Sequence, residues 1–296
     1  MLRMGIRGFF MGRDLGYSEI QIRKMEPADI ATGMRLKEIA GWNQVEQDWQ
    51  RFLALAPNGC FVAEEDGEII GTVVTVIFDG RVGWVAMVLV PPEHRRKGIG
   101  TAMLQHGMDY LTASGVETIK LDATPMGREV YLPLGFVDEY GLQRMQGKGV
   151  PTLSQGVRSM DLADLDEVIA LDRPIYGTDR GGLLKELFKD AGSFCGIYES
   201  SGRVAGYVMA RPGSRAFQIG PLLGETDLVQ QELFCWILER LAGQAVFFDA
   251  LNPAAVDCAA AYGFSVQRSF TRMYLGDEPF RGRPKWVFAT SGPEKG

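Results

Sequence analysis

The segment Arg95-Arg96-Lys97-Gly98-Ile99-Gly100-Thr101 combines three cationic side chains with two glycines. It follows an apolar run, Trp84–Val90, and opens a stretch with helical periodicity. Glycines let successive amide N–H groups converge, and a helix N-terminus adds partial positive charge. The segment therefore suits a phosphate or pyrophosphate, although a solvated helix cap has the same composition. Neither a Walker loop nor a complete dinucleotide fingerprint is present, because Met103 stands in place of the third glycine.

The elements that must position this segment follow from hydrophobic periodicity and turn residues. Asp66-Gly67 and Asp79-Gly80 each predict a hairpin between apolar runs. The order strand, helix, helix, three strands, helix, strand, helix, strand predicts an α/β fold, an α+β mixed sheet flanked by helices. The predicted strands are Ile20–Met25, Cys60–Glu65, Glu68–Phe78, Arg81–Val90, Thr118–Ala123 and Phe136–Met145, and the predicted helices are Asp29–Ala40, Gln44–Ala54, Gly98–Ala113 and Gly127–Leu134.

The chain also repeats itself. A shift of 135 residues aligns Ile22-Arg23-Lys24-Met25 with Val157-Arg158-Ser159-Met160, and a shift of 128 aligns Gly135-Phe136 with Gly263-Phe264. The second copy lacks about eight residues, and they fall at the position of the basic loop. We predict a leader at 1–18, disordered or an over-long start, a first domain at 19–147 and a second at 153–296, with the boundary near 146–154.

Two motifs at this separation resemble the GCN5-related N-acetyltransferase (GNAT) superfamily. They are Arg-x-x-Gly-x-Gly at Arg95–Gly100 and Tyr-x-x-Leu-Gly-Phe at 131–136. The likeness covers 20–146 closely and reaches the second half through the repeat. Gly41-Trp42-Asn43-Gln44, together with a degenerate second domain, resembles a two-domain bacterial subgroup similar to the YitH-type acetyltransferases. The resemblance implies tandem acyl-CoA N-acyltransferase (GNAT) folds.

The resemblance also implies roles for residues of the first half. Acetyl-CoA would be the co-substrate, a strand edge would pair with its pantetheine arm, and the basic loop would hold its pyrophosphate. An amine would attack the thioester directly, and an amide near Val88 would polarise the carbonyl. Tyr131 would be catalytic, protonating the departing thiolate or hydrogen-bonding its sulfur; a core tyrosine is the alternative. The residues implied for the cofactor are Met87, Val88, Leu89, Val90, Arg95, Arg96, Lys97, Gly98, Ile99, Gly100 and Thr101.

The acceptor site and the general base are less defined. The resemblance implies that Trp42 and Asn43 border the acceptor pocket, and aromatic walls suit an amine or cation; a packed corner between helices is the alternative. Carboxylates near strands, and equally a water chain, could accept the proton. Asp122 recurs as Asp249, which favours a shared structural role. The carboxylates weighed as bases are Glu64, Glu65, Asp79 and Asp122.

The second half has lost both functional motifs. The basic loop is replaced by a short segment in which Glu225 and Asp227 would repel a pyrophosphate. Ala259 stands where the first half has Tyr131. We predict a non-catalytic domain that covers the first and shapes the acceptor pocket. We predict a closing strand at residues 286–290.

Composition excludes several classes of protein. Of the 296 residues, 46% are hydrophobic and 23% charged, which excludes a disordered chain, and the net charge of −6 disfavours nucleic acid and anionic membranes. Two histidines exclude a His-rich metal site, so no metal is expected. Four dispersed cysteines predict a reducing, cytoplasmic location. The sequence is compatible with a homodimer.

These features predict an acetyl-CoA-dependent N-acetyltransferase acting on a primary amine of a small molecule or peptide. A non-enzymatic CoA-binding sensor is the alternative, and retention of both the loop and Tyr131 favours the enzyme, since a binder needs no acid. Transfer of a longer acyl group is a third reading. The identity of the acceptor stays open among polyamine-like molecules, amino acids, antibiotics and protein N-termini.

Overall fold

The computed structural model describes residues 20–296, so the predicted leader at 1–18 lies outside the described residues. The element order of the first half is repeated in the second, which confirms the internal repeat. The first half contains β1 (Gln21–Lys24), α1 (Ile30–Ile39), α2 (Glu46–Leu55), β2 (Cys60–Glu65), β3 (Glu68–Phe78), β4 (Val82–Leu89), α3 (Ile99–Ala113), β5 (Thr118–Ala123), α4 (Pro125–Tyr131) and β6 (Val137–Lys148). The second contains β7 (Val157–Ser159), α5 (Leu165–Tyr176), α6 (Gly181–Ala191), β8 (Cys195–Ser200), β9 (Arg203–Arg211), β10 (Phe217–Gly224), α7 (Asp227–Arg240), β11 (Ala245–Ala250), α8 (Pro253–Ala261), β12 (Ser265–Gly276) and β13 (Val287–Ala289).

Local sequence explains the matching hairpins of the two halves. Asp66 and Gly67 both have positive φ, at 52° and 82°, as the tight turn between β2 and β3 requires. Ser201 and Gly202 repeat this geometry between β8 and β9, at 53° and 76°. The hairpin predicted at Asp66-Gly67 is therefore confirmed, and the second half contains its equivalent at Ser201-Gly202.

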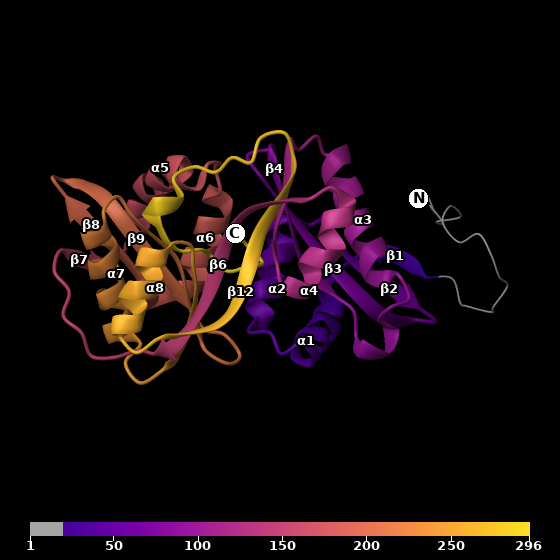
Figure 1. Ribbon diagram of the computed structural model, residues 1–296, viewed down its shortest axis with the longest axis horizontal. Helices are drawn as coiled ribbons and strands as arrows, with labels where there is room; N and C mark the ends of the chain where they lie inside the picture. Colours follow the sequence, from indigo (N-terminus) through magenta and orange to yellow (C-terminus); the bar gives the residue numbers. More distant parts are fainter. Residues whose placement is uncertain (1–19) are drawn as a thin grey trace.

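The thirteen strands found within residues 20–296 form one continuous mixed sheet (Figure 1), in which the two halves exchange their last strands. The order is β1-β2-β3-β4-β5-β12-β6-β11-β13-β10-β9-β8-β7. Strand β12 of the second half lies against β5 of the first, and β6 of the first half lies against β11 of the second. The sequence predicts a final strand for each half but not this exchange, because the two strands have equivalent patterns and either partner satisfies them.

Two buried ion pairs join the exchanged strands. Arg272 on β12 donates from Nε and Nη2 to Asp122 on β5, at 2.8 and 2.9 Å. Arg144 on β6 makes the equivalent pair with Asp249 on β11, with both distances 2.9 Å. Asp122 and Asp249 therefore share a structural role, as their recurrence in the repeat indicates.

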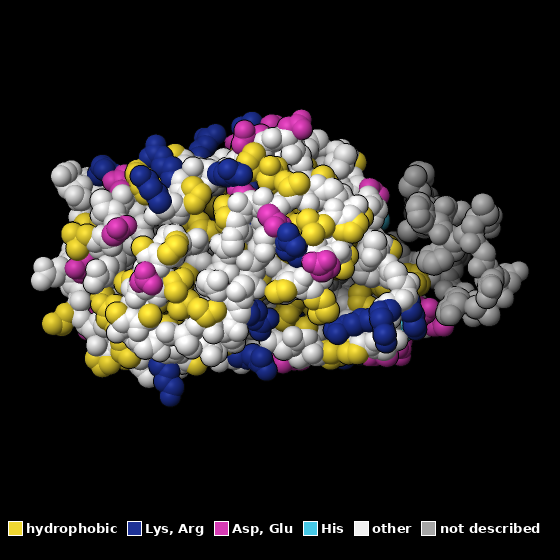
Figure 2. All heavy atoms as spheres, viewed as in Figure 1, with side chains coloured by type: hydrophobic (Ala, Val, Ile, Leu, Met, Phe, Trp, Pro, Cys, Tyr) yellow, Lys and Arg dark blue, Asp and Glu magenta, His cyan; other side chains and the backbone are white. Residues whose placement is uncertain are grey.

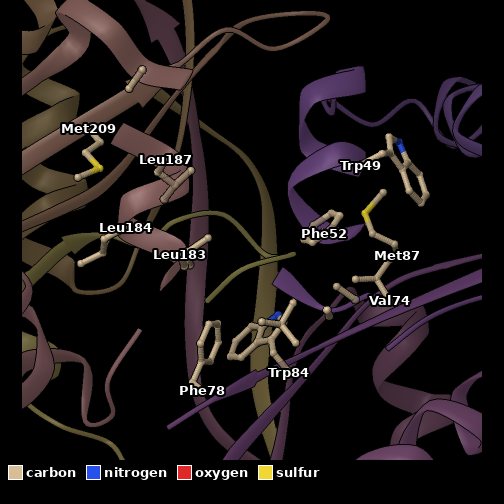
Figure 3. Close-up of a cluster of buried hydrophobic side chains, with 14 of the residues drawn as sticks. Trp49, Phe52, Val74, Phe78, Trp84, Met87, Leu183, Leu184, Leu187 and Met209 are labelled. Atoms are coloured by element: carbon tan, nitrogen blue, oxygen red, sulfur yellow. The ribbon is translucent and has the colours of Figure 1, made fainter. Parts of the chain in front are cut away.

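The hydrophobic core is shared between the halves on one side of the sheet. Helices α1 and α2 of the first half pack with α5 and α6 of the second in a single cluster. Figure 3 shows Phe52 and Trp84 facing this cluster from the first half, with Leu183 and Leu187 of α6 across from them. On the opposite side, α3 packs on β2–β5 in its own cluster, and α7 and α8 pack on the second half.

The segment between the halves differs from its predicted form. Strand β6 runs to Lys148, whereas the pattern predicts an end at Met145. Gly147 lies inside this strand. A larger residue would not fit there, because a Cβ would lie 2.6 Å from the Phe264 ring. The domain limits 19–147 and 153–296 stay a prediction. Among residues 20–296, no helix has the length and apolar character needed to cross a membrane.

Candidate active site

Strand β4 carries a bulge at the position that the sequence assigns to the cofactor. Thr72 of β3 opposes Leu89, but Val74 opposes Ala86, so Met87 and Val88 together face one residue of β3. Met87 has a φ of 53°, which is uncommon for a residue other than glycine. Bulges of this kind redirect backbone groups beside functional sites.

The bulge directs a free amide group away from β3. The Thr72 hydroxyl donates to the Met87 carbonyl at 2.7 Å. Because the N–H of a trans peptide points opposite to its carbonyl, the Val88 N–H faces the other side of β4. No strand of the described chain pairs with Val88 there. This N–H is a donor free to meet a developing oxyanion.

Strands β4 and β5 stop pairing beside the bulge, and the stretch between their unpaired edges is called the slot. The two parallel strands pair only from Val82 to Trp84, opposite Thr118 to Lys120. Beyond Trp84 both strands continue without pairing to each other, to Leu89 and Ala123 respectively. An extended molecule with amide groups can bind such a strand edge as an added strand.

The basic loop leads from the bulge to the N-terminus of α3. Gly98 adopts φ 82° at the N-cap, and the first helical bond runs from the Ala102 N–H to the Gly98 carbonyl at 2.9 Å. The N–H groups of residues 99–101 therefore point out of the helix end. No atom would lie within 4 Å of a Cβ at Gly98, and Gly100 would meet only Val90, at 3.7 Å. The loop is therefore open for close approach of a ligand.

The cationic side chains of this loop are available. Arg95 is held at the end of β4, where its Nε donates to the Val90 carbonyl at 2.9 Å. Arg95, Arg96 and Lys97 are exposed, and within residues 20–296 none of them forms an ion pair with a carboxylate. Figure 2 shows Lys and Arg side chains gathered at the lower right of the viewed face, below the place of α3 in Figure 1. The loop can hold a diphosphate with amides and cations together.

Tyr131 ends helix α4, and its half-buried ring lies beside Phe136 with the centroids 6.0 Å apart. Burial raises the pKa of its phenol above the ordinary value of 10.0, so the hydroxyl stays protonated at neutral pH. A protonated phenol is the state that a general acid requires.

Of the four carboxylates weighed as general bases, three have cationic neighbours and the fourth, Glu65, lies beside an imidazole. Glu64 accepts from Arg23 at 2.8 Å, and Asp122 pairs with Arg272. Glu65 lies 3.6 Å from His94, and Asp79 lies 3.5 Å from Arg173. The base therefore stays unidentified.

Asn43 and Trp42 lie in the connection between α1 and α2. Asn43 is buried and uses its side-chain amide to hold a loop of the second half: its Oδ1 accepts from the Arg215 and Ala216 N–H groups, and its Nδ2 donates to the Ala216 carbonyl. It also borders a small cavity between the halves. Trp42 is half-buried against the shared core. Their role toward an acceptor stays a prediction.

Sequence reasoning missed a buried ion cluster beside that cavity. Asp48 on α2 contacts Arg51 at 2.6 Å, Arg211 at 3.3 Å and Lys295 at 2.9 Å. Burial opposes ionisation of Asp48, but these three cations hold its pKa well below its ordinary value. The members come from three distant segments, so no local spacing could reveal them. Of these residues, only Arg211 stands directly after an apolar run in the sequence, residues 204–210.

The second half fills the slot that the first leaves open. Strand β13 lies between β10 and β11, and pairs antiparallel with both. Leu223 of β10 corresponds to Leu89 of β4, because Leu223 opposes Tyr207 as Leu89 opposes Thr72. Leu223 pairs with Val287 of β13, and its neighbour Leu222 pairs with Ala289. The predicted closing strand is thus confirmed.

The other two cofactor features, the basic loop and the tyrosine at the end of α4, are also absent from the described second half. Nine residues, 90–98, connect β4 to α3, whereas only Glu225 and Thr226 connect β10 to α7. Glu225 is neutralised by Arg203, so repulsion is weaker than its charge alone predicts. Ala259 accepts from the Phe264 N–H as Tyr131 accepts from that of Phe136, which confirms that these two positions correspond.

An open strand edge beside an amide-lined helix start is the arrangement that the resemblance to the GNAT superfamily implies for coenzyme A. The sequence profile of the Acetyltransferase (GNAT) family matches residues 31–136, and that of an Acetyltransferase (GNAT) domain matches 168–289. The chain belongs to the GNAT family and carries two such folds in tandem. Family membership makes it an acyl-CoA-dependent acyltransferase.

Individual relatives span most of the chain. Holothin acyltransferase of Pseudoalteromonas sp. (strain SANK 73390) is 28% identical over 243 residues, which are 80% of this chain and 82% of that protein. The uncharacterized N-acetyltransferase YitH of Bacillus subtilis (strain 168) is 25% identical over 230 residues, 75% of this chain and 78% of that one. A putative acetyltransferase from Pyrococcus horikoshii has a similar fold, with a TM-score of 0.82 at 21% identity, over 98% of this chain and all of the other.

Proposed function

We propose that this chain is an acetyl-CoA-dependent N-acetyltransferase that modifies a primary amine, with catalysis in the first half. One observation carries the proposal: the slot beside β4 is open and exposes the Val88 N–H, whereas the corresponding slot beside β10 holds β13. The cofactor would use the open edge, with its diphosphate at residues 95–101. The second half would support the first and close the acceptor side.

The reaction follows from these positions. The neutral amine nitrogen attacks the thioester carbonyl carbon, and the Val88 N–H stabilises the negative charge that develops on the oxygen. The new C–N bond remains as the C–S bond breaks. Tyr131 gives its proton to the departing sulfur, and the nitrogen loses a proton to a base or water. The raised pKa of Tyr131 keeps its phenol protonated, which is the state from which it can donate.

The test measures thiol release from acetyl-CoA over a panel of amines, together with binding of acetyl-CoA by calorimetry. We expect one molecule bound per chain and thiol release that depends on the amine, with the acetylated amine detected by mass spectrometry. Binding without transfer to any amine would favour the sensor instead. Absence of binding would reject both.

A further inference from the structure

The last residues of the sequence lie inside the molecule. After β13, the tail segment, defined as Ser291–Gly296, passes between the two halves, and the C label of Figure 1 lies near their centre. Glu294 and Lys295 are 5% and 1% exposed. Charged residues are rarely buried this deeply unless specific partners receive them.

The tail segment lies beside the start of the open slot. Trp84, the last residue of β4 paired to β5, donates from Nε1 to the Pro293 carbonyl at 3.2 Å. Trp84 packs with Phe52 of α2, whereas its neighbour Val85 packs in the cluster of α3. The tail therefore occupies the sheet face opposite α3, which is where an acceptor could reach the slot without crossing the basic loop.

Each charge of the tail has a counterpart outside the tail. Lys295 Nζ lies 2.9 Å from Asp48 Oδ1, and Glu294 Oε1 lies 2.8 Å from Arg211 Nη2. The two tail charges are adjacent, with Lys295 Nζ 2.5 Å from Glu294 Oε1. Asp48 and Arg211 are themselves neighbours at 3.3 Å. The site thus binds an ammonium and a carboxylate side by side.

Without the tail, this site is balanced in charge. Arg51 contacts both Asp48 and Asp190, and Arg211 contacts Asp48. The two carboxylates therefore balance the two guanidinium groups, and the formal charges cancel. A bare cation or a bare anion would leave one buried charge unpaired, which is costly. A molecule that carries one charge of each sign would leave none.

The surroundings contain further unused polar capacity. Gln44 is buried, and among the described residues its Oε1 has no hydrogen-bond partner; it lines the same small cavity as Asp48, Arg211 and Glu294. A second cavity, lined by Tyr140 and Arg272, meets the other end of the tail at Gly296. The tail therefore lines both cavities, one at Glu294 and the other at Gly296.

We propose that Glu294 and Lys295 occupy the acceptor site as a stand-in for substrate, and that the acceptor is an α-amino acid. Its ammonium would bind Asp48 and its carboxylate Arg211. This inference rests on the proposed function and names the substrate class. The bound ammonium would lose one proton before its nitrogen attacks the thioester, because only the neutral amine is nucleophilic.

Competition by the tail has a measurable consequence. If the site is free in only about 1–10% of molecules, the apparent affinity for an acceptor falls to that fraction of its intrinsic value, which is a loss of about 10–100-fold. The double variant Glu294→Ala with Lys295→Ala removes both tail charges and leaves Asp48 and Arg211 to pair with each other. We expect kcat/KM for α-amino acids to rise by about 10–100-fold in this variant.

The experiment uses matched pairs of probes in the full chain. L-leucine is compared with isopentylamine, and L-phenylalanine with phenethylamine, which lack only the carboxylate. In the double variant we expect the amino acid of each pair to be preferred by at least about 10-fold, as loss of a charge-assisted hydrogen bond implies. Adding Arg211→Gln should bring this ratio close to one.

Each result has one meaning. Equal kcat/KM in the natural and double-variant proteins would show that the tail does not block the acceptor, and equal use of paired probes would reject an amino acid as substrate. Should no amine be acetylated while acetyl-CoA still binds, the proposed function fails; calorimetric titration of L-leucine into the double variant then tests the site alone. The isosteric variant Glu294→Gln with Lys295→Met repeats the test if the alanine variant does not unfold cooperatively.

Discussion

The exchange of final strands predicts a large loss of stability when one of its ion pairs is broken. In the Asp249→Asn variant, Arg144 would lose a bidentate partner at 2.9 Å and remain buried, because only 7% of the residue is exposed. Removing one partner of a buried pair costs about 3–5 kcal/mol. At about 2–4 °C for each kcal/mol in domains of 150–250 residues, the Tm should fall by roughly 6–20 °C.

The assay is thermal unfolding followed by calorimetry at fixed protein concentration and pH. A matched control replaces the pair by apolar residues, Arg144→Met with Asp249→Leu, which leaves no unpaired charge and should recover most of the loss. The surface pair of Arg81 and Glu117, each about half exposed, gives a second control: Glu117→Gln should change the Tm by less than about 2 °C. A fall of less than about 3 °C in Asp249→Asn would refute a buried pair at the exchanged strands.

Two further predictions concern the proposed site. Tyr131→Phe should lower kcat by about 10²–10⁴-fold with little change in the affinity for acetyl-CoA, and the Tyr262→Phe control should leave both unchanged. Because the pKa of Tyr131 is raised, the acid is lost only when pH rises through that pKa, so deprotonation of this group should cause no fall in kcat below pH 10. Gly98→Val should weaken acetyl-CoA binding at least about 10-fold, because φ 82° is strained for valine and the turn presents the amides. Gly115→Val, at φ 80° beyond the other end of α3, is the matched control and should bind normally.

Much of the fold could be predicted from local sequence. The strands Cys60–Glu65, Glu68–Phe78 and Thr118–Ala123 have the predicted bounds, because turn residues and apolar runs mark them on both sides. The loss of the basic loop from the second half, visible in the repeat, corresponds to the short connection of Glu225 and Thr226.

Long-range features could not be predicted in this way. The exchange of β6 and β12 depends on which of two equivalent strand edges each of them joins. The sequence patterns around Arg144 and Arg272 are compatible with either edge. The cluster around Asp48 and Lys295 joins residues 247 positions apart, and nothing near either residue in the sequence indicates the other. Burial of charge is a property of the assembled fold, so these residues became visible only in three dimensions.

The central claim is that coenzyme A binds in the slot beside β4 and not in the slot beside β10. Hydrogen–deuterium exchange followed by mass spectrometry, with and without coenzyme A, tests this claim most directly. Peptides that cover Met87–Thr101 should become protected, whereas those covering Gly220–Val229 should not change, because β13 already pairs with β10. Protection in the second segment, or none in the first, would contradict the claim.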